Sequence, residues 1–294
     1  MDDTLRRGFE QVIEDGWRAL DDYGWRESVE KNRKADLSVR VTDDKGRPVG
    51  AKIQIEQLSH AFHVGANLFL LDEIEDASLN RAYRERFIEA FNIATIAFYW
   101  NTLEIEPGKP RFSVDAPKRY RRPSTDLCVN FCRESGIEPK LNCLFYEQHL
   151  PDWLPKRDAA RMKELYRKRF GEIAARYRDV IPQIEVANEA SLLAGIPRER
   201  LSVLSEERHI LDWAFREARD AFPQNTLLLN EAAPHCDYKG FFSPYYLLAE
   251  GLLERGASID GLQRLALAAR NQTQGLASRD ATRGNFPALS LGQA

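Results

Sequence analysis

The stretch Gln183-Ile184-Glu185-Val186-Ala187-Asn188-Glu189-Ala190 places an amide and a carboxylic acid directly after a short apolar run. We expect the run to form a strand, and in a barrel of parallel strands the catalytic groups lie where the strands end. A carboxylic acid there can protonate the oxygen that leaves when a glycosidic bond breaks, and the adjacent amide can hold a sugar hydroxyl. The alternative is that Glu189 only begins a helix, where the helix dipole favours negative charge.

On both sides of this stretch, short apolar runs alternate with amphipathic helices. The helical spacing of apolar residues is clearest in 79–91, 162–177 and 211–222. Such alternation is typical of strand–helix units around a parallel sheet. The expected strands are 62–68, 93–98, 139–145, 183–188, 226–230 and 258–262. The pattern predicts a (β/α)8 TIM barrel that is incomplete, with about six of the eight units such a barrel contains.

The two ends of the chain depart from this pattern. Residues 1–59 predict an appendage, a helix over 4–32 followed by a β-hairpin around Asp43-Asp44-Lys45-Gly46-Arg47-Pro48. The barrel is expected over 60–263. Residues 264–294 are rich in Ala, Arg, Gln, Ser and Gly, and predict an atypical tail that is disordered or weakly helical.

Composition excludes several classes of function. The net charge of −3 argues against a nucleic-acid partner. The sequence has no apolar run of about 18 residues, the length that would indicate a membrane-spanning helix, so no membrane partner is predicted. The first residues, Met1 to Gln11, lack the features of a signal peptide, so a cytoplasmic location is the default expectation. Cys128 and Cys132 share a helix face without a second Cys/His pair, so we expect free core thiols. No metal and no other cofactor is predicted.

Several further phrases follow one another along the chain in a fixed order. They are Phe62-His63-Val64-Gly65-Ala66, Glu104-Ile105-Glu106-Pro107-Gly108, Leu150-Pro151-Asp152-Trp153, Leu227-Leu228-Leu229-Asn230-Glu231 and Ile259-Asp260-Gly261. Together with Asn188-Glu189, their order and spacing resemble glycoside hydrolase family 10, the xylanase family. The resemblance implies a hydrolase that cleaves β-glycosidic bonds in a polysaccharide or oligosaccharide, xylan-like by family.

The resemblance also implies roles for individual residues. Glu189 matches the general acid/base, and Asn188 matches the amide that contacts the sugar at the cleavage point. Asn230 matches the asparagine that ends the fifth strand, with Glu231 in place of the usual Asp. Trp153 matches the tryptophan that borders the cleft.

Other positions differ from the family. The stretch that grips sugars after strand two is replaced by Ala97-Phe98-Tyr99-Trp100-Asn101-Thr102, where Trp100 is the candidate contact. After strand three, Glu147 and His149 replace a histidine and a glutamine and are further candidate sugar contacts. A site that loses hydrogen-bonding groups matched to one sugar loses that sugar steeply, so the substrate is not inherited with the family.

The second carboxylate is the largest departure. A retaining glycosidase needs a nucleophile about 5–5.5 Å from the acid, and the family places it at the end of strand seven. The last glutamate here is Glu254, and the family pattern stops after Gln263. We expect a truncation or a shifted reading frame. Three alternatives follow: an active hydrolase, an inactive remnant that binds carbohydrate or a partner, and a different hydrolase that pairs Glu147 with Glu189.

Overall fold

The computed structural model describes residues 25–56, 60–191, 196–232 and 244–265. These residues divide into two compact units, with the division between residues 61 and 62. The second unit, from residue 62 onward, contains the sheet and the candidate site. Most of the predicted tail and the predicted helix before residue 25 lie outside the described residues, so the prediction for both stays untested.

The described residues of the first unit form the helix α2 and a turn. The turn is held by Asp43, whose carboxylate accepts hydrogen bonds from the Lys45 and Arg47 backbone N–H groups at 3.0 and 2.9 Å. Gly46 provides the left-handed conformation that such a turn requires, with φ of 75°. One antiparallel bridge joins Thr42 to Pro48. The predicted hairpin is therefore short, a turn with a single bridged pair.

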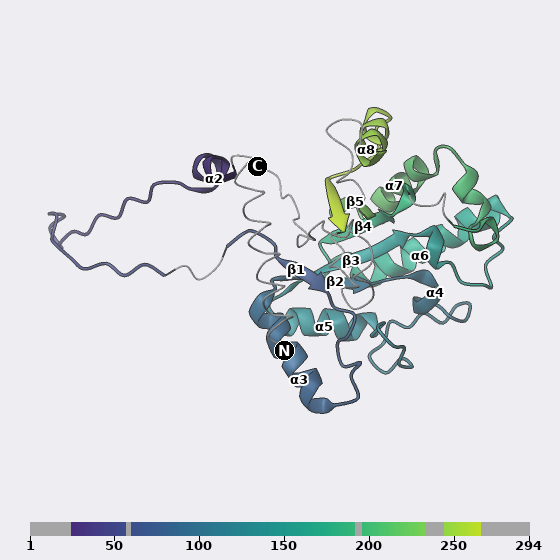
Figure 1. Cartoon of the computed structure of the whole chain (residues 1–294), viewed down its shortest axis with the longest axis horizontal. Coiled ribbons are helices and arrows are strands. Elements are labelled where there is room, and N and C mark those ends of the chain that lie inside the picture. The colour runs from purple at the N-terminus through teal and green to yellow at the C-terminus, as the bar shows by residue number, and fades with distance from the viewer. Residues whose placement is uncertain (1–24, 57–59, 192–195, 233–243, 266–294) are drawn as a thin grey trace, which may run out of the picture. The chain divides into compact units, whose positions relative to one another are not determined.

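The second unit is a six-stranded parallel sheet in which each strand pairs with the next one along the chain (Figure 1). Helices follow the strands, as expected for successive βα units. The strands are β1 (Gly65–Asn67), β2 (Ile93–Ala97), β3 (Glu138–Phe145), β4 (Gln183–Asn188), β5 (Thr226–Ala232) and β6 (Gly261–Leu265). The helices within the described residues are α2 (Trp25–Arg33), α3 (Ala77–Ala90), α4 (Trp100–Leu103), α5 (Thr125–Ser135), η1 (Glu147–His149), α6 (Ala159–Tyr177), η3 (Arg198–Arg200), η4 (Val203–Glu206), α7 (Ile210–Ala221) and α8 (Pro244–Glu254). The prediction of an incomplete (β/α)8 barrel is confirmed.

Local sequence explains where several helices begin and end. The Asp76 carboxylate accepts the Ser78 N–H at 2.7 Å and caps α3, and Asp158 caps α6 by accepting the Arg161 N–H at 3.0 Å. Gly136 ends α5 with φ of 66°. The helices then bury aromatic side chains against one face of the sheet, including the fully buried Tyr166 and Phe215.

The sixth strand begins three residues later than the sequence predicts, at 261 instead of 258. The reason is a side-chain contact. The Asp260 carboxylate accepts the Leu227 N–H at 2.8 Å and the Arg219 guanidinium at 2.5 Å. The residues before Gly261 are therefore fixed by this carboxylate before the regular ladder to β5 starts at Leu228.

Substitution of Gly65 tests how closely β1 approaches β2 in the sheet. A Cβ at this position would lie 2.5 Å from the Ile93 carbonyl oxygen on β2, closer than any real contact. We expect Gly65→Ala to lower the free energy of unfolding by about 1–3 kcal/mol through overpacking. Gly171→Ala in α6 is the matched control, because its Cβ meets nothing within 4 Å; it should raise stability by about 0.5–1 kcal/mol.

Urea unfolding followed by circular dichroism measures both changes. Equal effects of the two substitutions would contradict the close approach of β1 to β2.

Candidate active site

Glu189 is the first residue after β4, and its backbone directs its side chain. Its φ of 52° is a left-handed conformation that is uncommon for a non-glycine residue. Its N–H donates to the Asn230 carbonyl oxygen at 3.0 Å, which continues the pairing of β4 with β5 by one residue. The side chain is half-buried. The carboxylate therefore leaves the strand end at a fixed angle and remains open to solvent.

The Glu189 carboxylate lies against residues from the end of β3. Its Oε2 accepts the Tyr146 hydroxyl, and the Gln148 side-chain amide donates to the same oxygen at 3.4 Å. Burial, and then the Glu189 carboxylate, raise the pKa of Tyr146 far above its ordinary range. Tyr146 consequently keeps its proton and acts as a hydrogen-bond donor to Glu189.

Tyr99, Tyr146 and His149 form an aromatic floor beside this carboxylate. The rings of Tyr99 and His149 stack with centroids 4.5 Å apart and an angle of 9° between their planes. Tyr146 packs edge-on against Tyr99 at 5.5 Å. His149 Nδ1 lies 3.3 Å from the Asn101 side-chain oxygen. Tyr146 is buried, whereas Tyr99 and His149 are half-buried and carry the exposed part of the floor. Aromatic rings with a polar edge can border a sugar.

Burial lowers the pKa of His149 to about 4, and the positive charges of Arg122 and Arg200 lower it further. The ring is therefore neutral at neutral pH. It can donate one hydrogen bond and accept another, and it cannot serve as a cationic acid at that pH.

Asn188 and Asn230 belong to a buried polar layer inside the sheet. The Asn230 side-chain N–H donates to Asn188 Oδ1 at 2.6 Å. Below them, the Glu185 carboxylate accepts two hydrogen bonds from the Asn142 amide at 2.8 and 2.9 Å and lies 3.6 Å from Lys140 Nζ. Because Asn230 occupies Oδ1 of Asn188, the amide nitrogen of Asn188 is left to donate elsewhere.

The other predicted sugar contacts have different surroundings. The contacts of Trp100 are internal: its ring packs on Tyr166 at 4.7 Å, its N–H donates to Glu104, and 4% of the residue is exposed. Trp153 is half-buried and donates to the Glu104 carbonyl oxygen at 3.1 Å. The structure therefore places Trp100 in the core and leaves Trp153 at its edge.

Glu147 points away from Glu189. Its carboxylate accepts the Ser202 N–H at 2.8 Å and the Tyr166 hydroxyl at 3.2 Å, and burial raises its pKa. These bonds tie η1, directly after β3, to α6 and to the residue that precedes η4. A pairing of Glu147 with Glu189 across a sugar ring gains no support from this placement.

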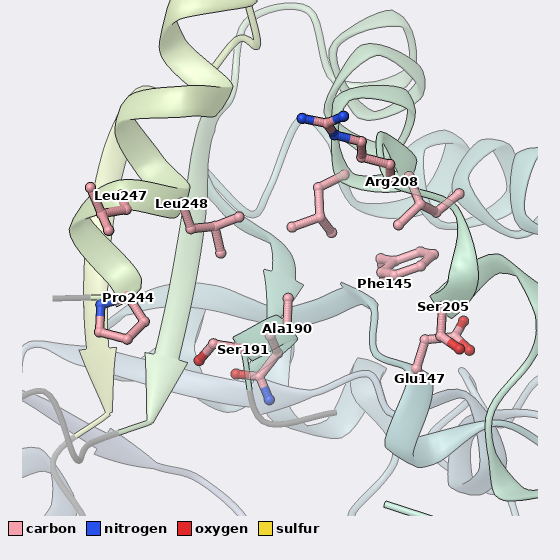
Figure 2. A pocket seen from close by; sticks show the side chains of 12 residues that line it. Phe145, Glu147, Ala190, Ser191, Ser205, Arg208, Pro244, Leu247 and Leu248 are labelled. Carbon is pink, nitrogen blue, oxygen red and sulfur yellow. The ribbon is translucent and has the colours of Figure 1, made fainter. Parts of the chain in front are cut away.

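A pocket of about 450 Å³ lies on the other side of the β4 end (Figure 2). Figure 2 shows Pro244, Leu247 and Leu248 of α8 on one wall and Phe145 with Arg208 on the other. Asn188, Ala190 and Glu147 contribute to its lining, and Glu189 does not. The pocket and the aromatic floor are therefore separate features of the same edge of the sheet.

Within the described part of the chain, no group of three His, Cys, Asp or Glu residues is placed to share a metal ion. In the same residues, no helix combines the length and hydropathy that a membrane crossing requires.

Comparison with known proteins places this arrangement in a family. The model of glycosyl hydrolase family 10 matches residues 72–275, which include the β2–β6 sheet and Glu189. The chain belongs to glycosyl hydrolase family 10.

Two curated relatives of this family 10 chain are xylanases by name. An endo-1,4-beta-xylanase/feruloyl esterase of Xylanibacter ruminicola is 28% identical over 192 residues, 58% of this chain and 25% of the relative. Endo-1,4-beta-xylanase 3 of Hypocrea jecorina is 25% identical over 166 residues, 55% of this chain and 44% of the relative. The chain thus spans less than half the length of either relative.

Solved structures show the same fold. Xylanase 10B from Thermotoga petrophila, in complex with xylobiose, superposes with a TM-score of 0.55 at 21% identity, over 69% of this chain and 59% of that one. Xylanase XynB from Paenibacillus barcinonensis superposes with a TM-score of 0.53 at 20% identity, over 70% of this chain and 60% of that one.

Sequence reasoning missed the two side chains that contact Glu189, Tyr146 and Gln148. Neither was among the predicted sugar contacts. Their position directly after β3 was the available indication, because the ends of neighbouring parallel strands meet at one edge. Which of them would touch Glu189 depends on contacts 41 and 43 residues apart in the chain.

The neutral state of His149 can be measured. We expect NMR titration of its ring to show a midpoint near pH 4. An unfolded histidine titrates near 6.5, so the unfolded state binds a proton that the folded state refuses between these values. The free energy of unfolding should therefore fall as pH drops from 6.5 to 4, and His149→Phe, which keeps the stack on Tyr99, should remove that part of the slope.

A His149 midpoint close to 6.5 would contradict the buried stack. An unchanged slope in His149→Phe would show that other groups cause it.

Proposed function

We propose that this chain carries the acid/base part of a family 10 glycoside hydrolase active site. Glu189 donates its proton to the leaving oxygen of a β-glycosidic bond in a xylan-like polysaccharide. The observation that carries the proposal is the half-open Glu189 carboxylate at the end of β4, held by Tyr146 and Gln148 beside the aromatic floor. The named xylanases among its relatives support the substrate class.

The neighbouring groups have complementary roles in this proposal. Tyr146 fixes one carboxylate oxygen of Glu189, which leaves the other oxygen to face the glycosidic oxygen. The free amide nitrogen of Asn188 donates to a hydroxyl of the sugar at the cleavage point, while Asn230 fixes the orientation of that amide. His149 and Trp153 border the neighbouring sugars.

Glu189→Gln tests the acid role, because the amide keeps the shape of the side chain and loses the transferable proton. General acid catalysis contributes roughly 10²–10⁴-fold, so we expect a loss of that size in hydrolysis of a β-xyloside with a poor leaving group. A dinitrophenyl leaving group needs no proton, so the loss in its release step should be much smaller. Glu134→Gln, an exposed position on α5, is the matched control.

Equal losses in Glu189→Gln on both leaving groups would rule out an acid role and point to a general defect of the site.

A second candidate function is carbohydrate binding without hydrolysis. It is favoured by one observation: the Glu147 carboxylate in η1 and the Glu231 carboxylate in β5 are buried and already accept hydrogen bonds, from Ser202 and Tyr166 and from Ser191 respectively. A retaining mechanism requires a second carboxylate about 5–5.5 Å from the first. If wild type and Glu189→Gln release no sugar from either substrate and both bind the same xylo-oligosaccharide, this second function holds and the hydrolytic one fails.

A further inference from the structure

Residues 117–122 form a strongly basic segment at the same edge of the sheet as Glu189. Their sequence is Pro-Lys-Arg-Tyr-Arg-Arg, with no acid among them. The segment lies in the connection that leaves the end of β2 and leads to α5. Connections of this kind build the active-site face in barrel enzymes.

The buried side chain of Arg111 holds this segment in place. Its guanidinium donates to the Pro117 carbonyl oxygen at 2.6 and 2.9 Å, and to the Thr102 and Arg122 carbonyl oxygens at 3.0 and 3.1 Å. Lys118 adds a bond from Nζ to the Asp72 carbonyl oxygen at 3.2 Å. Because the Arg111 guanidinium bonds to backbone carbonyl oxygens, it fixes the backbone of the segment. It brings no negative charge to the arginine side chains of residues 117–122.

Arg119, Arg121 and Arg122 form what we call the arginine rim. Within the residues that the structure describes, none of the three has a carboxylate partner, whereas arginines on α3, α5 and α6 do pair with or bond to acceptor side chains. The Nε atoms of Arg121 and Arg122 are buried and have no hydrogen-bond partner. Arg121 has a left-handed φ of 61°. The rim therefore concentrates positive charge and unused donors.

The positive charges of the arginine rim repel one another. Burial lowers the pKa of Arg122, and the charges of Arg121 and Arg119 lower it further. Like charges gathered in a partly buried place cost free energy unless an anion offsets them. This cost disappears when an anion binds.

The rim is joined to the acid/base position through stacked rings. The Arg122 guanidinium lies over Tyr99 at 4.6 Å and over Phe69 at 4.8 Å. Tyr99 packs on Tyr146, which donates to Glu189. Next to the rim, the ring of Tyr120 is exposed to 75% and offers an apolar face for a sugar. A glycan that reaches Glu189 along the aromatic floor can therefore also reach the rim.

We propose that the arginine rim binds the carboxylate of a uronic acid residue, so that the glycan of this cleft is an acidic polysaccharide. The inference rests on the proposed function in that it assigns both sites to one bound glycan. Arginine forks match carboxylates with two parallel hydrogen bonds, a geometry that a neutral sugar hydroxyl cannot reproduce.

The test compares two ligands that differ only in charge. One is a xylo-oligosaccharide with a single glucuronate branch, and the other is the same molecule after reduction of that carboxyl group to an alcohol. Binding is measured by calorimetry at low salt in the Glu189→Gln variant, which prevents hydrolysis. The measurement does not require that Glu189 be catalytic, so the two proposals can fail independently.

We expect the acidic ligand to bind about tenfold more tightly than the reduced one, since hydrogen bonds to charged groups are worth about that factor. Arg119→Gln together with Arg121→Gln should abolish this preference, and high salt should weaken it. These two side chains are preferred to Arg122, whose stacking on Tyr99 and Phe69 supports the fold. The matched control is Arg133→Gln together with Arg178→Gln. Arg133 is exposed on α5 and Arg178 is exposed directly after α6, and this variant should keep the preference.

Equal binding of the two ligands, binding of neither, or a preference that survives in the rim double variant would each overturn the proposal. So would inorganic phosphate binding to the rim as tightly as the acidic glycan, because the site would then belong to a small anion. If hydrolysis is absent and the acidic preference is intact, only the hydrolytic proposal fails.

Discussion

The buried polar layer inside the sheet is the constraint on which the rest of the structure depends. Lys140 and Asn142 share one face of β3, and both contact the fully buried Glu185 of β4. Burial raises the pKa of Glu185 to about 7 and lowers that of Lys140, so each group needs the other. A shift of register by one residue would turn every side chain of a strand to the opposite face and separate them. The cost of an unpaired buried charge therefore fixes the alignment of β3 with β4.

This alignment determines where Glu189 emerges. The bond from Asn230 to Asn188 extends the polar layer to β5, and the Glu189 N–H then takes the Asn230 carbonyl oxygen one residue later. The left-handed turn at Glu189 follows directly, and it directs the carboxylate toward Tyr146 at the end of β3. A side chain with a transferable proton must be held within a narrow range of positions to act on a bond. Here the interior of the sheet supplies that precision.

The strands, their parallel order and the position of Glu189 could be predicted because each depends on local pattern. Period and turn chemistry mark a strand within a few residues, and a carboxylate after a strand marks a barrel's active edge. Trp100 and Glu147 show the limit. An aromatic residue or an acid just after a strand fits a cleft and a core equally well in sequence, and the choice is made by distant partners. Here Tyr166 is the partner of both: the Trp100 ring packs against its ring, and its hydroxyl donates to the Glu147 carboxylate. The sequence around residues 100 and 147 gives no sign of these two contacts.

The same limit explains why the contacts around Glu189 escaped prediction, whereas its place directly after β4 did not. The family resemblance transfers one residue at a time, and the replaced positions were visible only as losses. In the structure those positions make new contacts with one another: Tyr99 stacks on His149, and Tyr146 donates to Glu189. The residues that replace the family's sugar-binding groups therefore contact one another. The Glu189 carboxylate itself is held by two donors, Tyr146 and Gln148. Around it, Oδ1 of Asn230 and the Nε atoms of Arg121 and Arg122 are buried without a hydrogen-bond partner, so these polar atoms are the ones that a ligand of the site would have to satisfy.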